Sequence, residues 1–179
     1  MTKSTFFNTI SLAITATAFL STTSLAAESD FSKGAIDIGI VVRDADRTAA
    51  FLTNAIGMTE VKGFPVSPEM GKKIGMIDGY ATDVRMFALL DSEPGAKIKV
   101  LSFPKAKAKA ADQKFIHSTL GVRYLALFVK DMNRAMERLK AAKIKTLGET
   151  PFDLGGGNYI AVVQDPDGNF IELIGPMKK

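Results

Sequence analysis

The sequence contains no cysteine and only one histidine, and these two absences exclude several kinds of chemistry. Without cysteine there is no disulfide and no thiol nucleophile, so packing alone must stabilise the fold. The single histidine, His117, cannot build a two-histidine, one-carboxylate iron site. No Ser-His-Asp or Cys-His catalytic arrangement is available either.

A long, strongly apolar run is also missing, which bears on the N-terminus. The first residues combine a basic Lys3, an apolar segment at Phe6–Leu20 interrupted by Ser and Thr, and a small-x-Ala cleavage site ending at Ala26. A membrane anchor needs about 18–20 strongly apolar residues. We therefore expect residues 1–26 to be a secretory signal peptide, and the mature protein to be periplasmic or secreted, with no stable membrane anchor.

The remaining residues, 27–179, are long enough for one domain with its own core. The formal net charge is +4, and Lys3 supplies one of these charges. Much of the rest comes from Lys105, Lys107, Lys109 and Lys114, which lie in an Ala/Lys stretch with no aromatics between them, within a linker at residues 105–120. We interpret this stretch as a solvated linker and expect no nucleic-acid partner, the alternative being a patch for an anionic surface.

Hydrophobic patterns predict short strands alternating with helices. Strands are expected at residues 35–42, 58–62, 83–91, 97–103, 122–129, 143–147, 159–164 and 170–174. Helices are expected from Asp44 to Gly57, from Ser67 to Gly75, and after Asp131. The sequence Asp-Pro-Asp-Gly at residues 165–168 predicts a tight turn that closes a β-hairpin.

The chain repeats itself. Ile38–Asp44 aligns with Leu125–Asp131 at a constant offset of 87 residues, and Ile98–Leu101 aligns with Ile171–Ile174 at an offset of 73. Two copies of a βαβββ unit are therefore present in one chain, which predicts an α+β fold. We call residues 35–104 module one and residues 121–176 module two.

The doubled βαβββ unit resembles the vicinal oxygen chelate superfamily, because each first strand runs into Val-x-Asp before a helix and the chain closes with Asp-Pro-Asp-Gly-Asn-Phe-Ile-Glu-Leu. That superfamily contains glyoxalase I enzymes, methylmalonyl-CoA epimerases, extradiol dioxygenases, fosfomycin-resistance transferases and bleomycin-binding proteins. The resemblance covers Ala35–Pro176. It implies that the sheets of two modules form a cup around a small-molecule site, either within one chain or by exchange in a homodimer.

Metal-dependent members of that superfamily take one metal ligand from the first strand and one from the fourth strand of each module. The resemblance carries these positions onto Asp37, Lys99, Tyr124 and Glu172. Only Glu172 keeps the expected residue type, because a tyrosine is a poor ligand at neutral pH and a lysine ammonium repels a metal. We therefore expect no metal cofactor; the alternative is a divalent ion held by Asp37 and Glu172.

The same four residues, together with Phe128, are the candidate ligand-binding residues. With the topology of the superfamily, strand alternation places Asp37, Lys99 and Glu172 on the cup-facing side. Lys99 then takes the electrostatic position of the metal and offers its three donors to the two carboxylates, so that Lys99 is the expected partner of Glu172, and the Tyr124 hydroxyl donates to one of the acids. Two interpretations remain open: a structural ion pair, or a polar cluster that anchors a ligand at the bottom of an apolar cup.

We expect an exported protein that binds a small, partly apolar molecule in this cup without a metal. The alternative is an enzyme of the glyoxalase, epimerase or dioxygenase type with a rebuilt site. Its catalytic candidates are the same four residues, with Glu172 or Asp37 as general base and Lys99 or a metal stabilising an enolate. Arg85 and Arg123 are either contacts for an anionic ligand or structural ion pairs, and Gly155-Gly156-Gly157 is a turn or a loop at the cup rim.

Overall fold

The computed structural model describes residues 30–90 and 95–178. The predicted signal peptide lies outside these residues. The chain divides into two units, residues 1–32 and 33–179, and every helix and strand discussed below belongs to the second unit. Among the described residues, no helix has both the length and the apolar character needed to cross a membrane.

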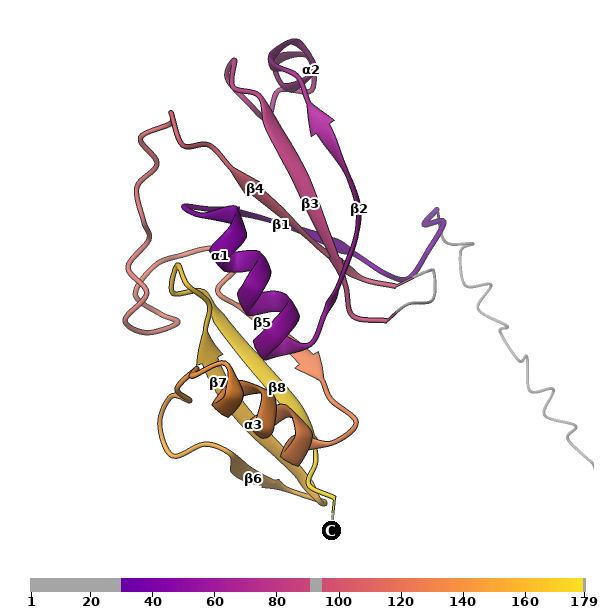
Figure 1. The fold of residues 1–179 in the computed structure, drawn as a ribbon, viewed down its shortest axis with the longest axis vertical. Helices are drawn as coiled ribbons and strands as arrows, with labels where there is room; N and C mark the ends of the chain where they lie inside the picture. Colours follow the sequence, from indigo (N-terminus) through magenta and orange to yellow (C-terminus); the bar gives the residue numbers. More distant parts are fainter. Residues whose placement is uncertain (1–29, 91–94, 179) are drawn as a thin grey trace, which may run out of the picture. The chain divides into compact units, whose positions relative to one another are not determined.

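Module one is a four-stranded mixed sheet with a helix packed on one face (Figure 1). Its elements are β1 (Asp37–Val42), α1 (Ala45–Ala50) continuing into the π-helix η1 (Phe51–Ile56), β2 (Thr59–Val66), α2 (Pro68–Lys73), β3 (Thr82–Ala88) and β4 (Lys97–Ser102). The strand order is β1-β4-β3-β2, with β1 and β4 parallel and the other neighbours antiparallel.

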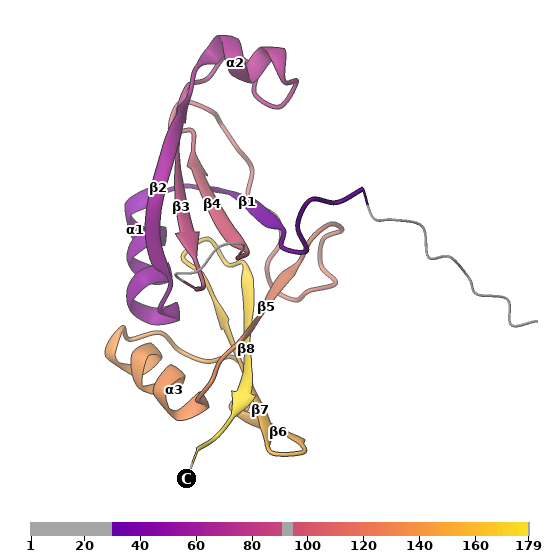
Figure 2. The ribbon, with the colours of Figure 1, turned by 90° about the vertical axis from the view of Figure 1, so that its right-hand side faces the viewer.

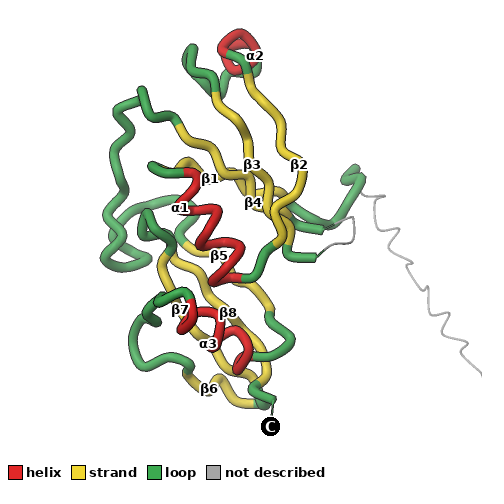
Figure 3. Tube along the Cα trace, viewed as in Figure 1, coloured by secondary structure: helices red, strands yellow, loops and turns green. Residues whose placement is uncertain are grey.

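Module two has the same topology, as the alternation of strands and helices along the chain shows in Figure 3. Its elements are β5 (Tyr124–Phe128), α3 (Met132–Ala141), β6 (Phe152–Gly155), β7 (Asn158–Gln164) and β8 (Phe170–Pro176). The strand order is β5-β8-β7-β6, with β5 and β8 parallel. The predicted α+β fold of two βαβββ modules is confirmed.

The sequence repeat is also a repeat of strand register. In module one, Asp37 pairs with Lys97 and Gly39 with Lys99 across β1 and β4. In module two, the residues at the same offsets pair across β5 and β8: Tyr124 with Phe170, and Ala126 with Glu172. The two modules are therefore superposable residue by residue along their parallel strand pairs.

The Val-x-Asp motif that begins each helix is a helix cap. The Asp44 carboxylate accepts a hydrogen bond from the backbone N–H of Arg47 at 3.0 Å. The equivalent Asp131 carboxylate accepts from the N–H groups of Asn133 at 3.0 Å and Arg134 at 3.5 Å. Each aspartate thus satisfies donors of the first turn that have no partner within the helix.

The closing turn between β7 and β8 forms as the sequence predicts. The Asp165 carboxylate is buried and accepts hydrogen bonds from the N–H groups of Asp167 at 2.9 Å and Asn169 at 2.8 Å. Gly168 has φ +90°, which a residue with a side chain rarely adopts. The Asp167 carboxylate then accepts from the Arg43 backbone N–H at 3.0 Å, so the hairpin of module two binds the start of α1.

The two modules share one hydrophobic core, which lies between the helices and the sheets. Both main helices, α1 and α3, lie on the same side of the sheets in Figure 2, and α3 packs against η1. The Arg138 guanidinium of α3 donates to the Ile56 carbonyl at 3.1 Å. The core draws on both modules through Phe51, Leu52, Phe87, Val100, Leu127, Met132, Leu139 and Leu173, among others.

One predicted strand is wrong, and the ends of several others differ from the structure; the strand expected at residues 58–62, for example, is β2, which runs to Val66. The strand expected at residues 143–147 is wrong, because Lys143 turns the chain at φ +57° and only Leu147 makes a backbone bond to β7, to the Val162 carbonyl at 2.7 Å. The strand of module two that precedes β7 is instead β6, and residues 156–157 form the turn between them. In module one, β3 ends at Ala88, while Asp91 lies outside the described residues.

Candidate functional site

A cavity of about 630 Å³ lies over the sheet of module one. Because Ile98 and Val100 point into the core, strand alternation directs Lys99 and Leu101 to the opposite face, where they line the cavity. We call this space the module-one cavity. It is lined by Asp37, Gly39, Val41, Phe64, Val66, Met70, Ile74, Met76, Ile77, Asp78, Tyr80, Val84, Lys99, Leu101, Phe103 and Ala106.

The segment between β2 and β3 forms one wall of this cavity. Ser67 caps α2 by accepting from the Met70 N–H at 3.2 Å, and Pro68 occupies the first turn, as the sequence predicts. Tyr80 packs edge-on against Phe103, with ring centroids 6.4 Å apart. The segment contributes long, flexible methionines that adapt to different occupants, Met70 and Met76.

The charged residues of the cavity meet at one end of β1 and β4. The Lys99 Nζ lies 3.1 Å from Asp37 Oδ2, and the Lys33 Nζ lies 3.8 Å from Asp37 Oδ1. This geometry follows from register, because Gly39 is opposite Lys99 and Asp37 is two residues before Gly39 on the same face. The Asp37 and Lys99 side chains are 23% and 32% exposed, so the pair is partly covered.

The Lys99 ammonium holds the pKa of Asp37 below its ordinary value, through a side-chain hydrogen bond and through its charge. The charges of Lys33 and Lys97 lower that pKa further. Asp37 is therefore a carboxylate at neutral pH and a weak general base. Its arrangement suits anchoring or orienting a ligand better than abstracting a proton.

Tyr124 lies near the pair, but across a second space. A further cavity of about 630 Å³ is lined by Asp37 and Gly39 of β1 and by Tyr124 and Ala126 of β5. Asp37 therefore belongs to both cavities, and Tyr124 to the second. Within residues 30–90 and 95–178, no hydrogen bond joins Tyr124 to Asp37.

Glu172 and Phe128 lie outside both cavities. Of the two contacts expected for Lys99, the one with Asp37 forms, and the expected pairing of Lys99 with Glu172 is wrong. Glu172 belongs to the other sheet, where it pairs with Ala126 and Val162. In the part of the chain that the structure describes, no ion pair or hydrogen bond reaches its carboxylate. Phe128 is 81% exposed at the end of β5.

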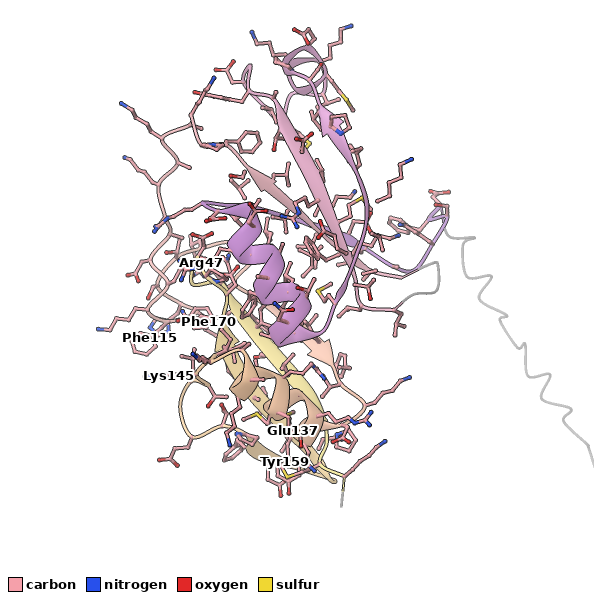
Figure 4. The ribbon with its side chains drawn as sticks, viewed as in Figure 1. Arg47, Phe115, Glu137, Lys145, Tyr159 and Phe170 are labelled. Atoms are coloured by element: carbon pink, nitrogen blue, oxygen red, sulfur yellow. The ribbon has the colours of Figure 1, made fainter. Side chains whose placement is uncertain are left out.

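The residues at the four superfamily positions do not fit a divalent metal. A lysine ammonium lies 3.1 Å from the one carboxylate that lines the cavity at these positions, where it opposes a second cation. Among the described residues, no three His, Cys, Asp or Glu side chains are grouped so that they hold a metal ion. His117 lies in the linker, where its ring stacks on Phe115 with centroids 5.4 Å apart; Figure 4 labels Phe115.

Arg85 and Arg123, each expected to contact either an anionic ligand or another part of the protein, both make contacts within the protein. Arg85 binds both carboxylate oxygens of Glu60, at 2.7 and 2.8 Å, and Asp46 at 2.7 Å. The Arg85 hydrogen bond lowers the pKa of Glu60, and the same contacts raise the pKa of Arg85. Arg123 donates to the Ile116 carbonyl at 3.0 Å and so fixes the linker. Both are structural contacts.

Sequence reasoning missed Lys33, which precedes β1 in a segment with no recognisable pattern. It also left the apolar wall largely unassigned. The alternation of β1 and β4 is the signal that could have identified part of this wall, since Val41, Leu101 and Phe103 follow Asp37 and Lys99 at even spacings.

The comparison with protein families identifies the class. The model of the Glyoxalase/Bleomycin resistance protein/Dioxygenase superfamily matches residues 35–173. The chain belongs to this superfamily, which is the one that the sequence resembles. No curated protein matches the sequence.

Solved structures agree on the fold. A glyoxalase family protein from Bacillus cereus has a TM-score of 0.69 at 18% identity, covering 85% of this chain and 99% of its own. Trypanothione-dependent glyoxalase I from Leishmania major has a TM-score of 0.56 at 19% identity, covering 80% and 87%. The fosfomycin resistance protein FosX from Listeria monocytogenes has a TM-score of 0.51 at 17% identity, covering 82% and 96%. At such identities the likeness extends to the fold alone.

Proposed function

We propose that this protein binds a small, partly apolar molecule in the module-one cavity without a divalent metal. The observation that carries the proposal is the cavity itself, because apolar walls of β1, β4 and the β2–β3 segment surround one charged pair, Asp37 and Lys99. Its volume of about 630 Å³ lies within the range typical of small-molecule sites. A few polar groups in an apolar lining orient a ligand, and the apolar area provides most of the affinity.

Metal independence is part of the proposal, and the chemistry of the donors supports it. The Lys99 ammonium supplies the positive charge that a cation would otherwise supply beside Asp37. Export is also part of the proposal, supported by the pattern of residues 1–26. A binding protein outside the cytoplasm and free of cysteine has no thiol to oxidise.

One sample tests both binding and metal independence. The protein is purified without a metal-binding tag and labelled with ¹³C at its methionine methyl groups, and its divalent metal content is measured. We expect far less than one metal per chain, and small apolar compounds should shift the methyl signals of Met70 and Met76 in the cavity wall. The buried core residue Met132 is the internal control and should stay unshifted.

Stoichiometric metal that is lost in Asp37→Ala would refute metal independence. A library of small, partly apolar compounds that shifts neither wall methionine would refute binding in the module-one cavity. Native mass spectrometry of the same preparation detects a co-purified ligand independently of the library.

A further inference from the structure

The charges at the Asp37 end of the module-one cavity do not cancel. Asp37 contributes one negative charge, while Lys99 at 3.1 Å and Lys33 at 3.8 Å contribute two positive charges. The remaining acid of the lining, Asp78, lies exposed in the β2–β3 segment, where water screens its charge.

Lys99 also has hydrogen-bonding capacity left. An ammonium has three N–H donors, and Lys99 directs one of them toward Asp37. In residues 30–90 and 95–178, no other side chain or backbone group is bonded to Lys99. Two donors thus remain for an acceptor on a ligand in the cavity, and an anionic acceptor gains charge assistance as well.

Polarity changes along the cavity in one direction. Beyond the charged end, the cavity is lined by Leu101 of β4 and by Phe103 just after that strand, and by Gly39 and Val41 of β1. At about 3.3 Å per residue, the backbone from Lys99 to Phe103 spans about 13 Å. Gly39 leaves room over the middle of this path, since a Cβ there would already contact Leu101 at 3.8 Å.

We propose that the ligand of the module-one cavity is an amphipathic organic monoanion whose carboxylate, or similar acid group, binds Lys99, while the charge of Lys33 beside Asp37 attracts it and its apolar body extends along Leu101 and Phe103 under the β2–β3 segment. This inference rests on the proposed function, because it names the ligand class of the same cavity. A positively charged end of the cavity disfavours cationic amphiphiles, and neutral amphiphiles should bind with lower affinity than the anion.

Three probes with the same octyl chain test the charge preference at neutral pH: octanoate, 1-octanol and octylammonium. Their affinities are measured from the methyl shifts of Met70 and Met76. Octanoate should bind about tenfold or more tightly than octanol, because a charge-assisted hydrogen bond is added. Octylammonium should bind most weakly, and added salt should weaken octanoate binding alone.

Substitutions at the charged end should move octanoate affinity in opposite directions. Lys99→Met keeps an unbranched apolar side chain of similar length without the charge and should abolish the preference for octanoate over octanol. Asp37→Asn removes the negative charge and should tighten octanoate binding severalfold. Lys140→Met, an equal change of charge on the exposed face of α3, is the matched control and should leave all three affinities unchanged.

The outcomes separate the two proposals. Equal binding of octanoate and octanol, or an octanoate preference that survives in Lys99→Met, would overturn the anion inference while leaving the binding function intact. If none of the three probes shifts Met70 or Met76, binding in this cavity is refuted, and the anion inference with it. If Lys99→Met does not fold, the octanoate preference is measured in Lys33→Met and as a function of salt. A preference that changes in neither experiment would likewise overturn the anion inference.

Discussion

Module one and module two share one strand register but differ on the faces that point away from the core. Toward the core, equivalent positions stay apolar in both copies, as Val100 and Leu173 show with 0% exposure each. On the opposite face, Asp37 and Lys99 form an ion pair in module one. The equivalent residues of module two, Tyr124 and Glu172, form none in the described chain. The core-facing pattern preserves the fold, and the other face is where the two copies have specialised.

The segments that connect the second and third strands of each module also differ. In module one, residues 67–81 join β2 to β3, include α2, and form a wall of the cavity. In module two, residues 156–157 join β6 to β7 directly. The ligand-binding machinery that we propose therefore belongs to one copy of the repeat, and the other copy provides packing.

The largest expected effect tests whether the two modules share one core. Leu173→Ala should lower the free energy of unfolding by about 2–5 kcal/mol, because a fully buried side chain is truncated inside the shared cluster. Val100→Ala, at the equivalent position, should cost less because it removes two side-chain carbons where Leu173→Ala removes three. Urea denaturation followed by circular dichroism should show a single transition for both variants. Two separate transitions would show that the modules unfold independently.

The ends of the two main helices provide an opposed pair of substitutions. Gly57 ends η1 at φ +88°, where a Cβ would also lie 2.9 Å from the Arg138 Nε, whereas Lys143 follows α3 at φ +57°. Gly57→Ala should destabilise the protein by about 1–2 kcal/mol, and Lys143→Gly should stabilise it by about 0.5–1 kcal/mol. Thermal and urea unfolding measure both changes.

Gly34→Ala is the control for this pair, because Gly34 has open space around it and no positive φ. It should change stability little. If Gly57→Ala and Lys143→Gly changed stability in the same direction, the two residues would not both end their helices in the left-handed backbone conformation.

The helix caps should respond alike in the two modules. Asp44→Ala and Asp131→Ala each remove a side chain that accepts first-turn N–H groups, and each should cost about 1 kcal/mol. Asp→Ser at either position should recover most of that loss, since serine also caps helices. Glu137→Ala, on the exposed face of α3, is the control. A loss at one position only would show that the equivalence of the motifs is limited to sequence.

The smallest expected effect is dependent on pH. Because the Lys99 ammonium lowers the pKa of Asp37 in the folded protein, this pair stabilises the fold above the pKa of the unfolded chain, near 3.8, and that stabilisation is lost as the pH falls through the folded pKa. The stability difference between wild type and Asp37→Asn should be under about 1 kcal/mol at neutral pH, since the pair is partly exposed.

This difference should be constant down to about pH 4 and shrink below it, as measured by urea denaturation from pH 7 to pH 3. Glu172→Gln is the matched variant in module two, where no ion pair reaches the carboxylate within the described residues. A stability difference for Asp37→Asn that grows as the solution is acidified would reverse the predicted sign.

Most of the fold could be predicted from the sequence because its determinants are local. The capping aspartates, the turn at residues 165–168 and the alternating strands act over a few residues, and the repeat then fixes the topology. The strand expected at residues 143–147 failed because its end depends on the unusual backbone of Lys143. A lysine gives no sequence signal for a left-handed conformation.

The candidate site could be predicted only in part. The contact between Asp37 and Lys99 follows from strand pairing, which the repeat defines. The expected contact between Lys99 and Glu172 needed the relative placement of two separate sheets, and alternation within each strand does not determine it. Lys33 reaches Asp37 from a segment without periodicity, so no pattern indicated it.

Among the described residues, the module-one cavity is lined only by positions between 37 and 106, and Lys33 lies just before them. The determinants of ligand choice that we propose therefore lie in one contiguous stretch of the sequence, residues 33–106. Recombination or random mutagenesis confined to that stretch can exchange specificity while module two remains as an unchanged structural partner. A duplicated unit of this kind allows module one to change its ligand specificity while module two keeps the shared core intact.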